Sequence, residues 1–313
     1  MHAEFEFVPF GAREIALLVS ALRHLTSVTI RTPVPISVDL ITILADLPKL
    51  RILQLAYMFT KPLELQFPLH PGLNFVALEE IELEDGQLHD YIRFFEALRG
   101  EHGIQRVDVN VKGCATRPAV ARFIQAVSSK VSRDTLSQFH LRATQLCESH
   151  SHSSHASDNQ TLFPLLRFRR MEHFSLTYCA SAWDNRLLED IALAWPALKS
   201  LDLSSHSGWA HTSNLTLGGL YPLAKHCPRL YYIHIVIAPF DGDTGRLPQR
   251  DWIQSAHQWP AEPMSIHIRM LSVDVHPGLL SYLQSIFPMQ PAGHISFNDN
   301  GTILRTHMGF YKG

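Results

Sequence analysis

The stretch Leu198-Lys-Ser-Leu201-Asp-Leu203 carries a phrase, apolar-x-x-apolar-x-apolar, that recurs throughout the chain. It returns as Leu50-Arg-Ile-Leu53-Gln-Leu55, Leu78-Glu-Glu-Ile81-Glu-Leu83 and Leu230-Tyr-Tyr-Ile233-His-Ile235. Nine copies begin at residues 25, 50, 78, 104, 136, 171, 198, 230 and 263, so the period is 25 to 35 residues. A unit this short cannot bury its own apolar edge, so a repeat with this period predicts a stack of similar units.

The two closing positions of each phrase are apolar in all nine copies, and the residue between them is polar. Side chains that alternate along a strand leave on opposite faces, so this pattern indicates a strand with one buried face. We therefore expect strands near 25–30, 50–55, 78–83, 104–109, 136–141, 171–176, 198–203, 230–235 and 263–268. The residues between the closing positions should face solvent: Thr29, Gln54, Glu82, Asp108, His140, Ser175, Asp202, His234 and His267.

Segments with helical periodicity separate the phrases, at 38–47, 90–98, 118–127, 187–193, 215–226 and 277–287. Strands that alternate with helices at this spacing predict the α/β class, with a right-handed crossover at each step. We interpret the chain as a right-handed leucine-rich-repeat solenoid, or horseshoe, with parallel strands on the concave face and helices on the convex face. It would form a single domain over residues 1–313, with a C-terminal cap at 289–313 that contains a hairpin around Asn300-Gly301.

Residues 148–160 interrupt this pattern with a Ser/His-rich tract whose only apolar residue is Ala156. Burial of a single alanine cannot offset the conformational entropy that the tract would lose on ordering. We therefore expect a mobile loop in place of a helix. Its histidines His150, His152 and His155 have the spacing to bind a transition metal. A solvated polar loop is the preferred interpretation because no anchoring ligand accompanies them. We therefore expect no metal and no cofactor.

Composition restricts the function classes. The 27 basic residues do not exceed the 29 acidic ones, which gives nucleic-acid binding no support. No stretch approaches the roughly 20 apolar residues of a membrane span, and the N-terminus lacks the features of a signal peptide. Four cysteines lie far apart without a C-x-x-C pair, so we expect reduced thiols in a cytoplasmic or nuclear monomer.

Known catalytic arrangements such as G-x-S-x-G and H-E-x-x-H are not found in the sequence. We therefore expect no catalytic residues and no enzymatic activity, and a hydrolase with an unrecognised site is a remote alternative.

The polar side chains of the concave face are the candidate protein-binding residues. They are Gln54, Glu80, Glu82, Glu84, Arg106, Asp108, Asn110, His140, Arg142, His173, Ser175, Asp202, Tyr232, His234 and His267. Glu80, Glu82 and Glu84 form an acidic row beside Asp108, and these charges repel one another unless a cation or a partner lies over them. The alternative is a well-solvated surface on which physiological salt screens the repulsion.

The repeat region resembles that of F-box/leucine-rich-repeat proteins, in particular the large families of basidiomycete fungi. The resemblance rests on Leu47-Pro-Lys-Leu50-Arg-Ile-Leu53, on Trp195-Pro-Ala-Leu198-Lys-Ser-Leu201-Asp-Leu203 and on the segment from Leu215 to Leu230. It implies the substrate-recognition half of a ubiquitin-ligase receptor, which binds an unidentified protein. The F-box of that family is not visible, so the ligase adaptor is an expected partner only if an F-box lies upstream. The alternative is a stand-alone or decayed leucine-rich-repeat scaffold without a ligase role.

Overall fold

The computed structural model divides the chain into two compact units, Met1–Glu148 (unit 1) and Ser149–Gly313 (unit 2). It describes residues 2–6, 17, 19, 21–32, 36, 38–57, 72–113, 116–143, 158–177, 182–204, 213–237, 265–270, 283, 286–287, 294–299 and 302–307. The boundary between the units falls at the start of the Ser/His-rich tract. Five of the nine phrases belong to unit 1 and four to unit 2. The single domain expected from the sequence stays a prediction.

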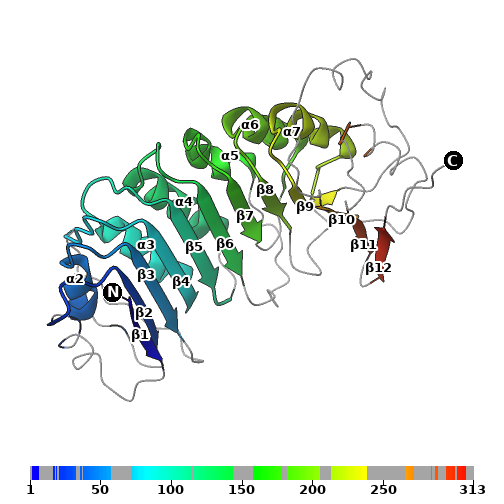
Figure 1. Cartoon of the computed structure of the whole chain (residues 1–313). Coiled ribbons are helices and arrows are strands. Elements are labelled where there is room, and N and C mark those ends of the chain that lie inside the picture. Colours follow the sequence, from blue (N-terminus) through cyan, green and yellow to red (C-terminus); the bar gives the residue numbers. More distant parts are fainter. Residues whose placement is uncertain are drawn as a thin grey trace. The chain divides into compact units, whose positions relative to one another are not determined.

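Unit 1 contains six parallel strands that neighbour one another in chain order (Figure 1). They are β1 (His2–Glu6), β2 (Ser27–Thr32), β3 (Ile52–Tyr57), β4 (Glu80–Gly86), β5 (Arg106–Val111) and β6 (Gln138–Ala143). Helix α2 (Val38–Ala45) connects β2 to β3, α3 (Leu88–Ala97) connects β4 to β5, and α4 (Arg117–Lys130) connects β5 to β6. Helices α3 and α4 lie behind the strands in Figure 1, which leaves the opposite face of these strands without a described helix.

Unit 2 repeats the same plan with six strands and ends in a hairpin. Parallel strands β7 (His173–Thr177), β8 (Ser200–Leu203), β9 (Tyr232–Ile237), β10 (Ser265–Met270) and β11 (His294–Asp299) neighbour one another in chain order. Strand β12 (Thr302–His307) runs antiparallel to β11, which confirms the predicted hairpin. The described helical elements are α5 (Asn159–Leu162), η2 (Phe163–Arg167), α6 (Asn185–Ala194), η4 (Leu217–Gly219) and α7 (Leu220–His226).

The strand register matches the repeated phrase position for position. In unit 1, Val28, Leu53, Ile81, Val107 and Phe139 pair in sequence across neighbouring strands. In unit 2, Phe174, Leu201, Ile233 and Ile266 do the same. All eighteen closing positions are at most 2% exposed, so the predicted buried face is confirmed. The strands begin two residues later than the phrases because the first member, such as the buried Leu25, precedes the strand.

Two parts of the fold differ from expectation. Strand β1 was not predicted, because one short segment, His2–Glu6, has no copy of the phrase to mark it. The C-terminal end predicted for the loop, residue 160, is also wrong. Asp158 caps the N-terminus of α5 by accepting a hydrogen bond from the Thr161 backbone, so residues 158–160 belong to a helix start. Residues 148–157, with the three histidines of the tract, lie outside the described residues, as does most of the expected helix at 277–287.

A chain of phenylalanine rings fills the space between the strands and helices of unit 1. The ring centroids of Phe75 and Phe94 lie 6.0 Å apart, those of Phe94 and Phe95 5.6 Å, those of Phe95 and Phe123 5.6 Å, and those of Phe123 and Phe139 6.3 Å. All five side chains are at most 2% exposed. Because the rings come from successive repeats, each repeat covers apolar surface of its neighbour.

Replacement of Gly86 by Ala should lower the free energy of unfolding by about 1–3 kcal/mol, as overpacking does in other cores. The Gly86 amide donates a 2.6 Å hydrogen bond to the hydroxyl of the buried Tyr91, and a Cβ at Gly86 would lie 2.5 Å from that oxygen. Gly103→Ala is the matched control, since nothing lies within 4 Å of its Cβ position. Chemical denaturation should show a loss for Gly86→Ala and a change within about 0.5 kcal/mol for Gly103→Ala; equal changes would contradict the packing described.

Candidate functional site

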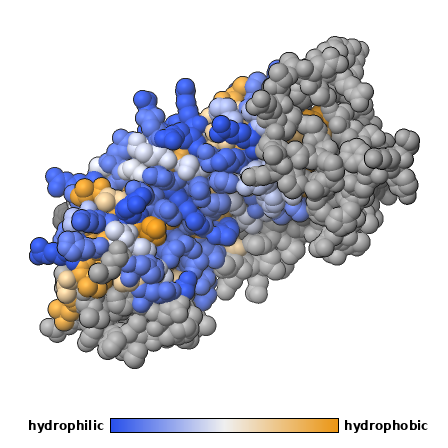
Figure 2. All heavy atoms as spheres, in the orientation of Figure 1, coloured by the Kyte–Doolittle hydropathy of each residue, from blue (hydrophilic) through white to orange (hydrophobic). Residues whose placement is uncertain are grey.

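The polar side chains that alternate with the buried ones form one continuous face on β2 to β6, hereafter the polar face of unit 1. Its middle row pairs five residues in register, one from each strand: Thr29, Gln54, Glu82, Asp108 and His140. Figure 2, drawn in the orientation of Figure 1, shows hydrophilic side chains over these strands. The sequence prediction that these residues share one face is therefore consistent with the strand register.

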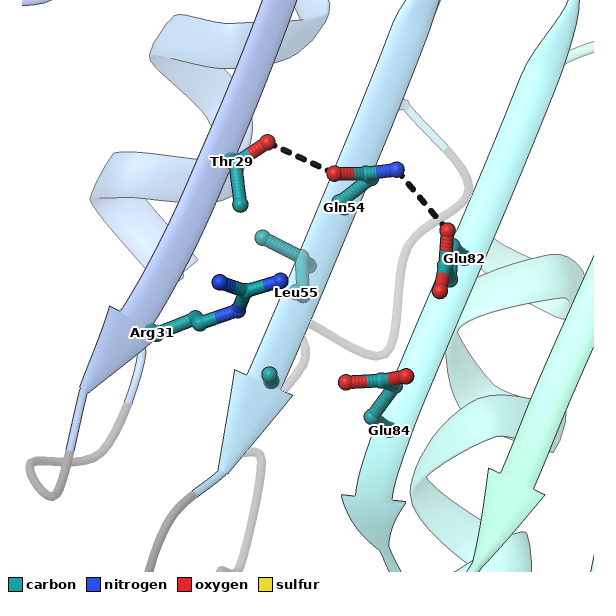
Figure 3. A pocket seen from close by; sticks show the side chains of 7 residues that line it. Thr29, Arg31, Gln54, Leu55, Glu82 and Glu84 are labelled. Carbon is teal, nitrogen blue, oxygen red and sulfur yellow. Dashed lines mark hydrogen bonds between the residues drawn. The ribbon is translucent and has the colours of Figure 1, made fainter. Parts of the chain in front are cut away.

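Side chains of the middle row are hydrogen-bonded from strand to strand (Figure 3). The Thr29 hydroxyl donates to Gln54 Oε1 at 2.7 Å, and Gln54 Nε2 donates to Glu82 Oε2 at 2.8 Å. The two bonds use both ends of the amide and fix its orientation. The surface is thereby organised before any partner arrives.

Three residues expected to face solvent are in fact buried. Thr29 is 3% exposed, Asp108 4% and Ser175 7%. All three lie on the polar face of their unit, and each is hydrogen-bonded to a neighbouring side chain. Alternation predicts the face of the strand on which a side chain lies. It does not predict how much of that side chain its neighbours on the same face shield from solvent.

Asp108 is the centre of an ion-pair cluster on β5 and β6. Arg106 Nη2 donates to Asp108 Oδ2 at 3.0 Å, and Arg142 Nη2 donates to Asp108 Oδ1 at 2.5 Å. Burial by itself would lower the pKa of Arg106, but Asp108, Glu82 and Glu80 together raise it above its ordinary value. The negative charge of Asp108 is thus compensated within the chain by Arg106 and Arg142, which is neither of the two alternatives that the sequence left open for this row.

Glu82 and Glu84 border a shallow hollow between β2 and β4 (Figure 3). Its other lining residues are Thr29, Arg31, Gln54, Leu55 and Ala56. Ala56 pairs with Arg31 on one side and with Glu84 on the other, so the hollow exists because a single methyl group lies between two long side chains. Burial raises the pKa of Glu84, and the adjacent Glu82 raises it further.

The empty space in this hollow is about 180 Å³, including open solvent. Pockets for small molecules occupy roughly 300–1,000 Å³. The enclosed part of the hollow has room for about one water molecule, so the hollow is a depression in the surface and too small for a separate organic ligand.

The polar face of unit 2 carries a different chemistry. His234 Nδ1 lies 3.4 Å from Asp202 Oδ1, and the backbone N–H of Ser204 donates to the same oxygen at 3.0 Å. The His267 ring lies 5.7 Å from that of His234 and 5.3 Å from that of Tyr232, between ring centroids. Burial raises the pKa of Tyr232, and the charge of Asp202 adds to this effect.

Burial alone would raise the pKa of Asp202, but the hydrogen bond and the charge of His234, together with Ser204, lower it below its ordinary value. The stability that this group contributes is present above the ordinary carboxyl pKa of about 3.9 and is lost as the pH falls through the lowered value. His234→Leu should therefore raise the pKa of Asp202, because burial is then opposed only by the hydrogen bonds from Ser204 and from the Thr177 hydroxyl. A carbon-13 NMR titration of the Asp202 carboxyl would measure this rise, and an unchanged pKa would contradict the pairing.

The remaining predicted site residues take the following places. Glu80 pairs in register with Arg106, and Asn110 pairs with Arg142. The Oδ1 atom of Asn110 is buried and has no hydrogen-bond partner among the described residues. His173 pairs with Ser200, and its ring centroid lies 6.4 Å from that of Tyr231. The structure thus brings the predicted residues together within each unit: nine in unit 1 and six in unit 2.

Three residues that shape the site of unit 1 were not in the predicted set. Thr29 continues the hydrogen-bonded row, Arg31 borders the hollow, and Ala56 forms its base. The sequence does offer a signal for the hollow. It is the residue two positions after each residue of the middle row, which is Arg31 on β2 and Ala56 on β3. An alanine among long polar residues at these positions indicates a depression.

The described part of the chain shows neither a metal centre nor a membrane span. No group of three or more His, Cys, Asp or Glu residues there has the geometry to hold a metal ion. No helix within the described ranges is long and apolar enough to cross a membrane. Cys227 is a free, buried thiol whose pKa burial raises to about 12.

A scan against models of protein families found no match to this chain, and a search of curated proteins found no relative.

Proposed function

We propose that the chain is a leucine-rich-repeat solenoid that binds a protein partner through the polar faces of its strands. In this proposal the strands line a concave surface and the helices a convex one. Nine copies of one phrase support it, since all eighteen of their closing side chains are buried and the described strands follow one another in register. We assign the chain no enzymatic activity and no cofactor.

The observation that carries the binding role is the hydrogen-bonded row on the polar face of unit 1. Binding costs entropy when mobile side chains must be ordered at an interface. Here Thr29, Gln54 and Glu82 already hold one another, and Asp108 already holds Arg106 and Arg142. A partner that meets this face would order few additional side chains. The hollow over Ala56 offers a place for the tip of one side chain of the partner.

Within this proposal the resemblance to F-box/leucine-rich-repeat proteins favours the substrate-recognition half of a ubiquitin-ligase receptor. The alternative is a stand-alone or decayed repeat scaffold. Sequencing transcripts upstream of Met1 separates the two: an in-frame F-box supports the receptor, and an in-frame stop codon without one supports the scaffold. The proposed partner is a protein in either case, and the proposed setting is the cytoplasm or the nucleus.

Partner capture with two matched variants tests the binding face. Glu80→Arg with His140→Arg adds positive charge and bulk to the polar face of unit 1. Asp46→Arg with Gln125→Arg makes the same change in charge on the exposed helical side. After proximity labelling and mass spectrometry, a partner found with wild type should be lost with the first pair and kept with the second. Loss with the second pair alone would place binding on the helical side and overturn the proposal.

A further inference from the structure

Three turns of unit 2 lead from the last residue of a helical element to the strand that follows it. They are residues 167–172 before β7, 194–199 before β8 and 226–231 before β9. The Lys199 N–H donates to the Glu172 carbonyl at 2.7 Å, and the Tyr231 N–H donates to the Lys199 carbonyl at 2.9 Å. The ends of these turns therefore lie side by side, and we call the three together the turn edge of unit 2.

Basic side chains dominate the turn edge. Its charged residues are Arg167, Arg169, Arg170, Glu172, Lys199 and Arg229. The one carboxylate among them, on Glu172, lies 2.8 Å from Lys199 Nζ. Arg169 and Arg229 are exposed, and no carboxylate of the described residues lies within ion-pair distance of either. The turn edge therefore carries an excess of positive charge.

The corresponding turns of unit 1 mix the two signs of charge. They are residues 45–51, 97–105 and 130–137. These turns hold five Lys or Arg and three Asp or Glu, whereas the turn edge of unit 2 holds five and one. The dipole of a helix favours basic side chains at its C-terminus in both units alike. The stronger excess in unit 2 is therefore a property of that unit and not of the repeat.

Two side chains of α6 border the turn edge and favour a protein as its partner. Leu193 is 59% exposed, and Glu189 is exposed one turn before it. The thiol of Cys227 donates to the Trp195 carbonyl at 3.6 Å, so the end of α7 packs against the end of α6. A leucine offers an apolar contact to a protein segment, whereas the affinity for nucleic acids comes mainly from phosphates, which a carboxylate repels.

We propose that the turn edge of unit 2 binds an acidic segment of a protein, with Asp or Glu side chains that pair with Arg169 and Arg229. This inference goes beyond the proposed function, because the turn edge is separate from the polar faces of the strands. Charge complementarity selects the acidic segment. Neighbouring parallel strands lie about 4.8 Å apart, so the first and third turns are roughly 10 Å apart where they enter β7 and β9. An extended segment covers that distance with about three residues.

The test uses the full chain and two fluorescent ten-residue peptides. One contains five Glu, three Ser and two Leu, and the other has Gln in place of each Glu. Fluorescence anisotropy should show binding of the acidic peptide that weakens as salt is added, and much weaker binding of the neutral one. Equal affinities, or no binding of the acidic peptide, would overturn the proposal. A thymidine hexanucleotide has the same five charges, and its tighter binding would identify the edge as a nucleic-acid site and also overturn the proposal.

Two matched pairs of substitutions locate the bound peptide. Arg169→Gln with Arg229→Gln should raise the Kd of the acidic peptide about fivefold, since each exposed ion pair changes Kd by roughly two- to fivefold. Lys49→Gln with Arg99→Gln removes the same charge from exposed turn positions of unit 1 and should leave Kd within about twofold. An unchanged Kd in the first pair, or equal losses in both, would contradict the proposal.

Melting curves identify any loss of binding that comes from unfolding, in which case Arg229→Gln alone tests the same edge. The outcomes also separate this inference from the proposed function. A captured partner that is lost with Glu80→Arg and His140→Arg, while the acidic peptide fails to bind, would refute the role of the turn edge and retain the polar face of unit 1.

Discussion

Phe123→Ala is expected to lower the free energy of unfolding by about 3–5 kcal/mol, the usual cost of removing a buried phenylalanine. Phe123 is fully buried, and its ring contacts Phe95 of α3 on one side and Phe139 of β6 on the other. Its removal leaves a cavity between two successive repeats, and their facing surfaces can close it only in part. Chemical denaturation followed by circular dichroism measures the effect.

Gln125→Ala, two residues further along α4, is the control. Its side chain is exposed, so the change should stay within about 0.5 kcal/mol. Comparable losses for Phe123→Ala and Gln125→Ala would mean that α4 faces the strands with a different side, and the burial pattern of unit 1 would then be wrong.

Asp108→Asn is expected to cost about 2 kcal/mol, because it removes the negative charge that both arginines face and leaves one acceptor oxygen in place of two. The Asp108 side chain is 6% exposed, whereas those of Arg106 and Arg142 are 37% and 47% exposed. Solvent screening of the two guanidinium groups keeps the cost below that of a fully buried ion pair. Arg106 Nε, already buried without a hydrogen-bond partner among the described residues, would be further from any negative charge.

A double-mutant cycle separates this pairing from general effects of substitution. Arg142→Gln alone should destabilise, and it should destabilise less in the Asp108→Asn background, since its partner is then neutral. Strictly additive losses would show that Arg142 and Asp108 do not interact, and the compensation of charge on this face would have to be reconsidered.

The sequence predicts the strands well because one phrase repeats nine times, and each copy checks the others. Leu53 and Leu55 alone would give little support for a strand. The same spacing recurs at Leu201 and Leu203, and this recurrence identifies the side chains that lie on the buried face. Strand β1 escaped prediction for the same reason, as it has no repeat partner in the sequence. Helix α5 escaped because its capping residue, Asp158, stands at the end of a tract with almost no apolar residue.

The candidate site was predictable as a face and not as a set of contacts. Alternation identified Asp108 and Asp202 as members of polar rows. It could not show that Asp108 is nearly buried between two arginines, or that Asp202 accepts from Ser204 and contacts His234. Those contacts depend on which residues become neighbours across strands, and this follows from the register between repeats 25 to 35 residues apart.

Carboxyl footprinting of the protein with and without its captured partner tests the binding face most directly. Carbodiimide labelling followed by mass spectrometry reports the accessibility of each carboxylate. Binding through the polar face of unit 1 predicts reduced labelling of Glu80, Glu82 and Glu84, with Asp39 and Asp46 unchanged. Reduced labelling of Asp39 and Asp46, with the three glutamates of β4 as reactive as in the free protein, would contradict it.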